Sequence, residues 1–440
     1  MISYYSYKDT GIEWLDEIPN AWDIKKIKFL SSKVGDGLHG TPEYTEHTEF
    51  YFINGNNLGD GLIQITPQTK SISEEQYYLN DKKLTLQTLL LSINGTIGNV
   101  AFYRGETVML GKSAAYIKFY DNINIQYIRW YLESSVFKNY YELELSGTTI
   151  KNLSLESIKN TPLTFPEKEE QIFISRFLDQ KTSQIDRLIE QKEKLLKLLA
   201  EKRTAIITQA VTKGLDPRVK MKDSGIDLLG NIPLNWKVSK IKFNGQTRYG
   251  LGEPPPKKTD GMPFIRATDI FRGKIDMANI QFIDPDFIPW SKKPTLHEGE
   301  ILVVRSGAYT GDSAMVTKEC DGFIAGYDMV YSPKSINSRF ISYVLLSEYM
   351  LIGQIYQARS RAAQPHLNAE ELGNFTIAMP PIEEQNQIAE FLNKFLDSTD
   401  TATTTIIKSI SKLKEYREAL ITSAVTGQID VRKEMVDSTK

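Results

Sequence analysis

A length of 440 residues allows roughly three domains, and 41% hydrophobic with 25% charged residues is typical of a globular protein that can bury sizeable cores. A single cysteine, Cys320, excludes an internal disulfide framework and a thiolate metal cluster within the chain. A net charge of -2 excludes a protein that coats polyanions by bulk attraction, so any contact with nucleic acid must be local.

The N-terminal residues MISYYSYKDT lack the basic and apolar regions of a signal peptide. We find no run of about 18 apolar residues that could cross a bilayer. Both observations predict a cytoplasmic protein without a membrane span.

The head and the tail of the first half of the chain recur in the second half. Residues 8–30 (KDTGIEWLDEIPNAWDIKKIKFL) reappear as residues 222–244 (KDSGIDLLGNIPLNWKVSKIKFN). The two tails share Pro166 with Pro380, Glu169–Gln171 with Glu383–Gln385, and Ala210–Thr212 with Ala424–Thr426. A period this long exceeds the about 20 to 50 residues of solenoid and propeller repeats, so it predicts two copies of a whole domain, each followed by its own helix. Trp22 and Trp236 are equivalent in the two copies, which favours core anchors over DNA contacts.

Residues 31–160 and 245–374 carry short β-type runs punctuated by Gly, Asn, Asp and Pro, which predict half-buried strands. Residues 51–58 parallel residues 263–270: the apolar positions agree and the polar ones differ. Residues 94–98 parallel residues 306–311 as a glycine-bracketed turn that joins two strands, and hairpin geometry alone accounts for these glycines.

The differing polar residues indicate two readers of different base edges. Asn54 in one copy corresponds to Arg266 in the other, and Asn pairs bidentately with adenine whereas Arg pairs with guanine. The stretch 237–258 holds six cations against one acid, which is typical of phosphate contacts, although a surface strand would also turn its lysines outward. His39, in an exposed loop, can contact a base or phosphate or simply belong to a turn. The predicted DNA-contacting residues are His39, Thr41, Asn54, Asn56, Asn57, Lys112, Thr148 and Thr149 in the first half, and Arg248, Tyr249, Lys257, Lys258, Arg266, Thr268, Arg305, Tyr309, Arg359, Arg361 and Gln364 in the second.

Two long helices are predicted, over residues 168–212 and 382–426, with Pro166 before the first and Gly214 after it. Apolar residues near a three-four spacing predict a seam, interrupted by Lys192 and Lys202, in which the helices pack on each other. About 40 helical residues make a rod roughly 60 Å long. An intramolecular antiparallel spacer is favoured, and a bundle or dimerisation helix remains the alternative. The predicted packing residues are Ile185, Leu188, Leu195, Leu199 and Ile206 in the first helix, and Ile406, Ile410, Leu413 and Leu420 in the second.

The sequence carries no recognisable catalytic or metal-binding motif. The segment Gly105–Ser113 resembles a phosphate-binding loop but has five residues between its glycines where four are needed. The four histidines have no spacing suited to a metal. The Asn-Pro-Pro-aromatic tetrapeptide with which amino-methylating enzymes hold their target base is also missing from the sequence. We therefore predict no catalytic residue and no bound metal.

The combination of KDxGIxxLxxIPxxW at each head, the glycine turn, and PxxEEQ followed by AVT at each tail resembles the specificity subunit of type I restriction-modification systems, over nearly the whole chain. The resemblance implies an α+β fold with two pseudo-symmetric α/β target-recognition domains separated by two long antiparallel coiled-coil helices. It implies a first recognition domain in residues 1–165, a helical spacer in 166–214, a second recognition domain in 215–379, a helical spacer in 380–428 and a flexible tail in 429–440.

The same resemblance implies a non-catalytic subunit that binds double-stranded DNA, with each domain reading one part of a split, asymmetric sequence. Methylation, translocation and cleavage would belong to two methyltransferase subunits and to restriction/translocase subunits. S-adenosylmethionine, ATP and Mg would then bind those partners, with no cofactor in this chain. Base-contacting residues vary within such families, so none is carried over. A fused methyltransferase-endonuclease specificity chain acting with a partner, and a scaffold without DNA selectivity, remain the alternatives.

Overall fold

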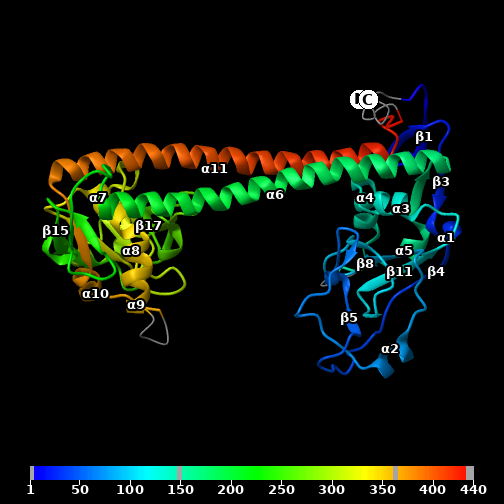
Figure 1. The fold of residues 1–440 in the computed structure, drawn as a ribbon, viewed down its shortest axis with the longest axis horizontal. Helices are drawn as coiled ribbons and strands as arrows, with labels where there is room; N and C mark the ends of the chain where they lie inside the picture. The colour runs from blue at the N-terminus through cyan, green and yellow to red at the C-terminus, as the bar shows by residue number, and fades with distance from the viewer. Residues whose placement is uncertain (1–3, 146–150, 360–364, 433–440) are drawn as a thin grey trace. The chain divides into compact units, whose positions relative to one another are not determined.

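The computed structural model describes residues 4–145, 151–359 and 365–432 (Figure 1). The chain divides into two compact units: unit 1 consists of residues 1–192 and 408–440, and unit 2 of residues 193–407. Each unit therefore contains part of both long helices. The five-part division expected from the sequence stays a prediction.

Unit 1 is built on a four-stranded antiparallel sheet in the order β4-β11-β8-β9. The strands are β4 (Ser31–Gly35), β11 (Ala114–Phe119), β8 (Thr88–Ser92) and β9 (Val100–Phe102). Every residue of β8 is buried, which explains its nearly continuous apolar sequence. Beside the sheet, β5 (Tyr51–Ile53) pairs in parallel with β10 (Val108–Leu110). Helices α3 (Ile125–Leu132) and α4 (Ser135–Glu144) lie between the sheet and α6 (Figure 1), and α5 (Leu155–Asn160) and α2 (Glu74–Asn80) complete the unit.

Unit 2 repeats this topology with different sequence. Its antiparallel sheet has the order β16-β24-β21-β22, and β17 pairs in parallel with β23 as β5 does with β10. The strands are β16 (Gly245–Tyr249), β24 (Met329–Pro333), β21 (Ile301–Val303), β22 (Ser313–Met315), β17 (Lys257–Ile265) and β23 (Ile324–Ala325). Unit 2 adds β20 (Gln281–Ile283) beside β17, and its sheet is covered by α7 (Ser338–Leu346), α8 (Glu348–Met350) and α10 (Ala369–Asn374). The predicted pair of equivalent mixed domains is confirmed.

The repeated heads form equivalent hairpins, and their tryptophans are buried. In unit 1, β1 (Tyr7–Ile12) pairs with β2 (Leu15–Pro19), and β3 (Asp23–Lys26) with β12 (Pro162–Phe165). In unit 2, β13 (Met221–Asp223) pairs with β14 (Asn231–Pro233), and β15 (Lys237–Lys240) with β25 (Thr376–Met379). Trp22 and Trp236 are almost fully buried, as predicted for core anchors. Trp22 Nε1 donates a 3.0 Å hydrogen bond to Glu170, at the start of the following helix.

The two long helices are α6 (Lys168–Lys213) and α11 (Ile382–Val425), within a residue of the predicted bounds. Gly214 follows α6 with a φ of 78°, the left-handed conformation that ends a helix. In unit 1, Arg417 Nε lies 2.9 Å from Asp186, and in unit 2 Arg203 Nη1 lies 2.8 Å from Asp400. Later residues of α6 thus meet earlier residues of α11, which confirms the antiparallel pairing. No described helix is long and apolar enough to cross a bilayer.

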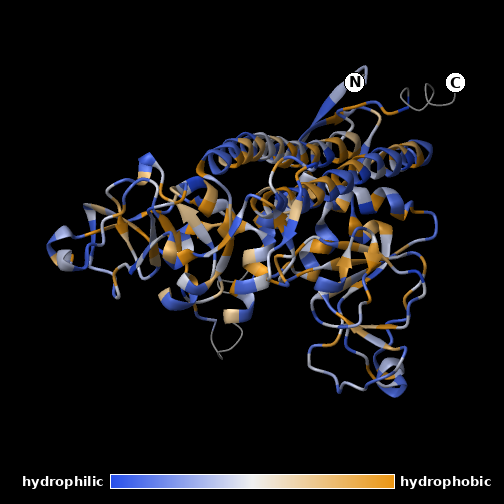
Figure 2. Cartoon of the chain, turned by 60° about the vertical axis from the view of Figure 1, so that its left-hand side comes forward, coloured by the Kyte–Doolittle hydropathy of each residue, from blue (hydrophilic) through white to orange (hydrophobic). Residues whose placement is uncertain are grey.

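At two positions of α6, the residue that faces the seam is the one after the predicted residue. Leu188 and Leu195 are 46% and 45% exposed, so their assignment to the seam is wrong. Three-four steps from buried Ile185 lead instead to Ile189 and on to Leu196, both partly buried. The other predicted packing residues lie buried or partly buried: Leu199, Ile206, Ile406, Ile410, Leu413 and Leu420. Hydrophobic and hydrophilic residues are interspersed along both helices (Figure 2).

Candidate nucleic-acid interface

Three loops of unit 1 that carry predicted DNA-contacting residues meet at one edge. The Leu38 N–H donates to Leu110 O at 2.7 Å, and the Gly111 N–H donates to Ile53 O at 2.8 Å. The chain segments that follow β4, β5 and β10 therefore lie side by side. We call residues 36–41, 54–57 and 111–113 the first edge.

Unit 2 has an equivalent second edge, formed by residues 249–252, 266–269, 305–309 and 326–328. The Leu251 N–H donates to Ala325 O at 3.1 Å, and the Gly326 N–H donates to Ile265 O at 2.8 Å. A Cβ atom on Gly37 would lie 2.0 Å from Leu110 O, and one on Gly250 would lie 2.0 Å from Gly326 O. Glycine is thus required in both edges by the same close approach of two backbones.

The first edge presents some predicted residues to solvent and uses others internally. His39 is exposed, and its Nε2 lies 2.6 Å from Asp36 Oδ2. Asn54 Oδ1 accepts a 2.9 Å hydrogen bond from Ser113 Oγ, and Asn57 Oδ1 accepts one of 3.0 Å from the Asn54 N–H. Thr41, Asn56 and Lys112 are exposed. His39, Thr41, Asn56 and Lys112 are therefore the exposed predicted residues of this edge.

Arg266 stands where Asn54 does, and it is also engaged within the chain. The Arg266 N–H donates to Asp269 Oδ2 at 2.9 Å, as the Asn54 N–H donates to Asn57, so each residue precedes an equivalent 3-10 turn, η3 (Ala267–Asp269) or η1 (Gly55–Asn57). The Arg266 side chain binds both Asp269 carboxylate oxygens, at 3.0 and 2.6 Å, and this hydrogen bonding raises the pKa of the guanidinium. The equivalence holds, but the structure gives both side chains a role in closing their own turns.

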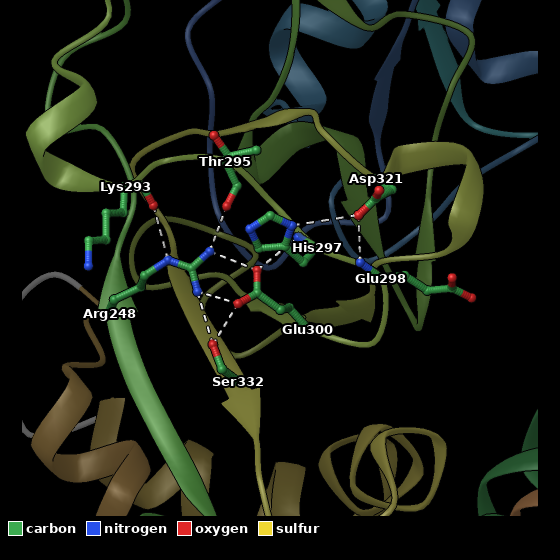
Figure 3. Close-up of polar contacts among 8 residues, drawn as sticks. All are labelled: Arg248, Lys293, Thr295, His297, Glu298, Glu300, Asp321 and Ser332. Carbon is green, nitrogen blue, oxygen red and sulfur yellow. Dashed lines mark hydrogen bonds and ion pairs between the residues drawn. The ribbon is translucent and has the colours of Figure 1, made fainter.

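Arg248 is the clearest correction to the predicted set. Its guanidinium donates to both Glu300 oxygens, to Ser332 Oγ at 2.9 Å, to Thr295 O at 2.8 Å and to Lys293 O at 3.2 Å (Figure 3). A guanidinium has five N–H groups, and all five are used here. Arg248 therefore has no donor left for a phosphate, and its assignment as a DNA contact is wrong.

The same ion pair shapes a cleft of about 950 Å³ in unit 2, lined also by Lys242, Trp290 and His297. Burial alone would raise the pKa of Glu300, but hydrogen bonds from Arg248, Ser332 Oγ and the His297 N–H lower it. Glu300 is therefore held as a carboxylate, and the pair is part of the internal framework of unit 2.

Apart from Tyr249 and Arg305, the remaining predicted residues of the two units fall into three groups. Lys257, Thr268 and Tyr309 are exposed. Lys258 is partly buried and pairs with Asp284 at 3.2 Å. Five predictions lie outside the described residues or side chains: Thr148, Thr149, Arg361, Gln364 and the side chain of Arg359.

The second edge brings Arg305 and Tyr249 together with Tyr327, which sequence reasoning missed. Arg305 Cζ lies 4.7 Å from the ring centre of Tyr249 and 4.3 Å from that of Tyr327. The Arg305 N–H donates to Asp328 Oδ1 at 3.3 Å. Burial raises the pKa of Asp328 to about 6. The sequence held a signal for the position of Tyr327 at this edge, although not for its contact with Arg305: Tyr327 follows Gly326 as Lys112 follows the equivalent Gly111.

The glycine-bracketed turns are hairpin turns, as their sequence predicted. The Gly98 N–H donates to Ser92 O at 3.0 Å between β8 and β9, and the Gly311 N–H to Val304 O at 2.8 Å between β21 and β22. Within residues 4–145, 151–359 and 365–432, no group of three or more His, Cys, Asp or Glu residues is arranged to hold a metal ion. The arrangement presents exposed polar and stacked cationic side chains, which suits binding.

The chain matches the family described as type I restriction modification DNA specificity domain over residues 20–198 and again over residues 235–412. It is 22% identical to the type I restriction enzyme MjaVIII specificity subunit of Methanocaldococcus jannaschii over 431 residues, which cover 94% of each chain. It is 25% identical to the type I restriction enzyme EcoBI specificity subunit of Escherichia coli over 294 residues, which cover 64% of this chain and 62% of that one.

Solved structures share the fold. A chain from a structure describing complex assembly and conformational transition of the type I R-M system has a TM-score of 0.70 at 14% identity, with 94% of this chain and 99% of that chain covered. The HsdS subunit from Thermoanaerobacter tengcongensis has a TM-score of 0.50 at 14% identity, with 94% and 98% covered. Since the two family matches take up most of the sequence and coincide with the two repeats, this chain belongs to the type I restriction-modification DNA specificity family.

Proposed function

We propose that the chain is the DNA-recognition subunit of a type I restriction-modification complex, and that each unit reads one block of a split, asymmetric target. The observation that carries this proposal is the pair of equivalent edges with unlike side chains. The first edge exposes His39, Asn56 and Lys112, whereas the second holds Arg305 between two tyrosines. Two frameworks of one topology with different polar groups are suited to reading two different base sequences.

The long helices set the length of the unread gap between the two blocks. α6 begins in unit 1 and ends in unit 2, and α11 runs from unit 2 back to unit 1, without a break in either helix. A helix of 46 residues is about 69 Å long, compared with about 34 Å for one turn of DNA. In this proposal the number of helical residues fixes the number of unread base pairs.

The chemistry belongs to partner subunits. Two methyltransferase subunits bind S-adenosylmethionine, and restriction/translocase subunits bind ATP and Mg, in the cytoplasm where the chromosome lies. The repeated heads and the exposed faces of the long helices offer two similar docking surfaces for the two methyltransferase subunits.

Mapping methylated bases in genomic DNA tests the proposal, in cells with and without this gene and with the methyltransferase subunit present in both. We expect a gene-dependent motif of two short, different blocks around an unread gap. An undivided motif would contradict the two-reader arrangement. The absence of any gene-dependent motif would favour a scaffold, and binding of S-adenosylmethionine by the isolated chain would favour an enzyme.

A further inference from the structure

The Arg305 guanidinium lies over two tyrosine rings that come from different parts of unit 2. Tyr249 ends β16, Tyr327 precedes β24, and Arg305 lies shortly after β21, where the hairpin turn begins. The two rings are 41% and 45% exposed, and Arg305 is partly buried between them. The Tyr249 hydroxyl accepts a 2.9 Å hydrogen bond from the Ala369 N–H, which fixes one ring. Contact with two rings restricts the orientations that the guanidinium can adopt.

Arg305 retains unused hydrogen-bond donors, whereas two other arginines of unit 2 have already used theirs. Its Nη2 lies 3.5 Å from His366 Nε2, a weak contact, and within the described residues its Nη1 makes no hydrogen bond. Its Nε is buried and has no partner there either. By contrast, Arg248 uses all five donors and Arg266 is bound to Asp269. The stacked arginine is therefore oriented by its rings and retains donors at Nη1 and Nη2 for an outside acceptor.

A guanidinium of restricted orientation suits a rigid pair of acceptors that matches its fork of donors. Guanine presents such a pair, O6 and N7, in the major groove, and arginine bound to both is a common base-specific contact. A phosphate also accepts two parallel hydrogen bonds from arginine, but it is present at every nucleotide and carries no sequence information.

Resting on the proposed function, we propose that Arg305 reads a guanine in the block recognised by unit 2, with Tyr249 and Tyr327 as the residues that position it. The first unit has no such reader at this place. The Leu367 N–H donates to Arg305 O at 2.8 Å, and the Leu153 N–H donates to Ile93 O at 2.8 Å, so Ile93 occupies the equivalent backbone position and is buried. A change at Arg305 should therefore alter one block of the target only.

The test uses the full chain assembled with its methyltransferase subunits and a DNA duplex library with randomised bases in both blocks. Arg305→Gln removes the charge, and Arg305→Lys keeps the charge but lacks the fork of donors. For both variants the preference for guanine at one position of the second block should fall roughly 5- to 150-fold, with the first block unchanged. Arg272→Gln is the matched control, because Arg272 is an exposed arginine of the same unit that lies over a single ring, 5.2 Å from Phe271. It should leave every base preference as it is.

Two results would overturn the inference while leaving the proposed function in place. One is that both Arg305 variants keep every guanine preference of the parent chain. The other is a uniform loss of affinity over all sequences with a weaker dependence on salt, which marks a phosphate contact. If the parent complex selects no two-block target, the proposed function itself fails. Thermal unfolding of each variant identifies loss of folding, and Arg305→Lys then carries the test because it retains the aliphatic stem and the charge between the rings.

Discussion

Ile185 and Leu188 lie three residues apart on α6, and the structure predicts opposite outcomes for the same substitution. Ile185 is 5% exposed and belongs to the core of unit 1 together with Leu178 and Leu420, whereas Leu188 is 46% exposed. Replacing Ile185 by alanine removes three buried carbon groups, worth about 2.4 kcal/mol at about 0.8 kcal/mol each. The cavity left between α6 and α11 adds to this, so the free energy of unfolding of unit 1 should fall by about 2–4 kcal/mol.

Leu188→Ala should change the same free energy by less than about 0.5 kcal/mol, because its side chain is already largely in water. Both variants place alanine in the helix, so differences in helix propensity are small beside the packing effect. Urea unfolding, followed by the fluorescence of the buried Trp22 and Trp130 and by helical circular dichroism, measures both values. Equal losses, or a larger loss for Leu188→Ala, would refute the seam and restore the register expected from the sequence.

Three further predictions concern unit 2 and the helices. Burial raises the pKa of Asp328 from 3.8 to about 6. The protonated side chain therefore stabilises the folded state fully below about pH 3.8, and this contribution of about 3 kcal/mol is lost as the pH rises to about 6. Asp328→Asn should flatten the dependence of the unfolding free energy on pH in this window, and an unchanged slope would count against a buried neutral carboxyl. Glu300→Ala should destabilise unit 2 by about 2–3 kcal/mol in urea unfolding by leaving Arg248 partly buried without its carboxylate, and a neutral result would mean that the pair is replaceable by water. Deleting seven residues near Leu195 and their counterparts in α11 shortens the helical pair by about 10 Å. Methylation mapping should then show a gap shorter by about three base pairs, with both blocks intact. Altered blocks would contradict the role of the helices.

Elements that repeat or follow a strong period could be predicted from the sequence. The duplication anticipated the equivalent sheets and the buried Trp22 and Trp236, and apolar spacing with Gly214 located both helices within a residue. The seam was misplaced at Leu188 and Leu195 because leucines occur on both sides of α6, and only contact with α11 determines which of them are buried.

The interface was harder to predict, because an arginine in a sequence does not reveal its partner. Arg248 meets Glu300, which is 52 positions away and reaches it only through the pairing of strands. Arg266 meets Asp269, three residues on, so the pattern Arg-x-x-Asp at a strand end is a signal that could have been used. The stacking of Arg305 between Tyr249 and Tyr327 depends on three separate strand ends and has no local signature.

Exchange of one recognition region tests most directly whether two copies of one framework read two different blocks. Residues 245–374 would be replaced by a second copy of residues 31–160 in the full chain, with both long helices kept, and methylated bases would be mapped in cells that carry the methyltransferase subunit. The second block should disappear and the first block should occupy both halves of the motif. Retention of the original second block would contradict the account, because it would mean that its bases are read from somewhere other than unit 2.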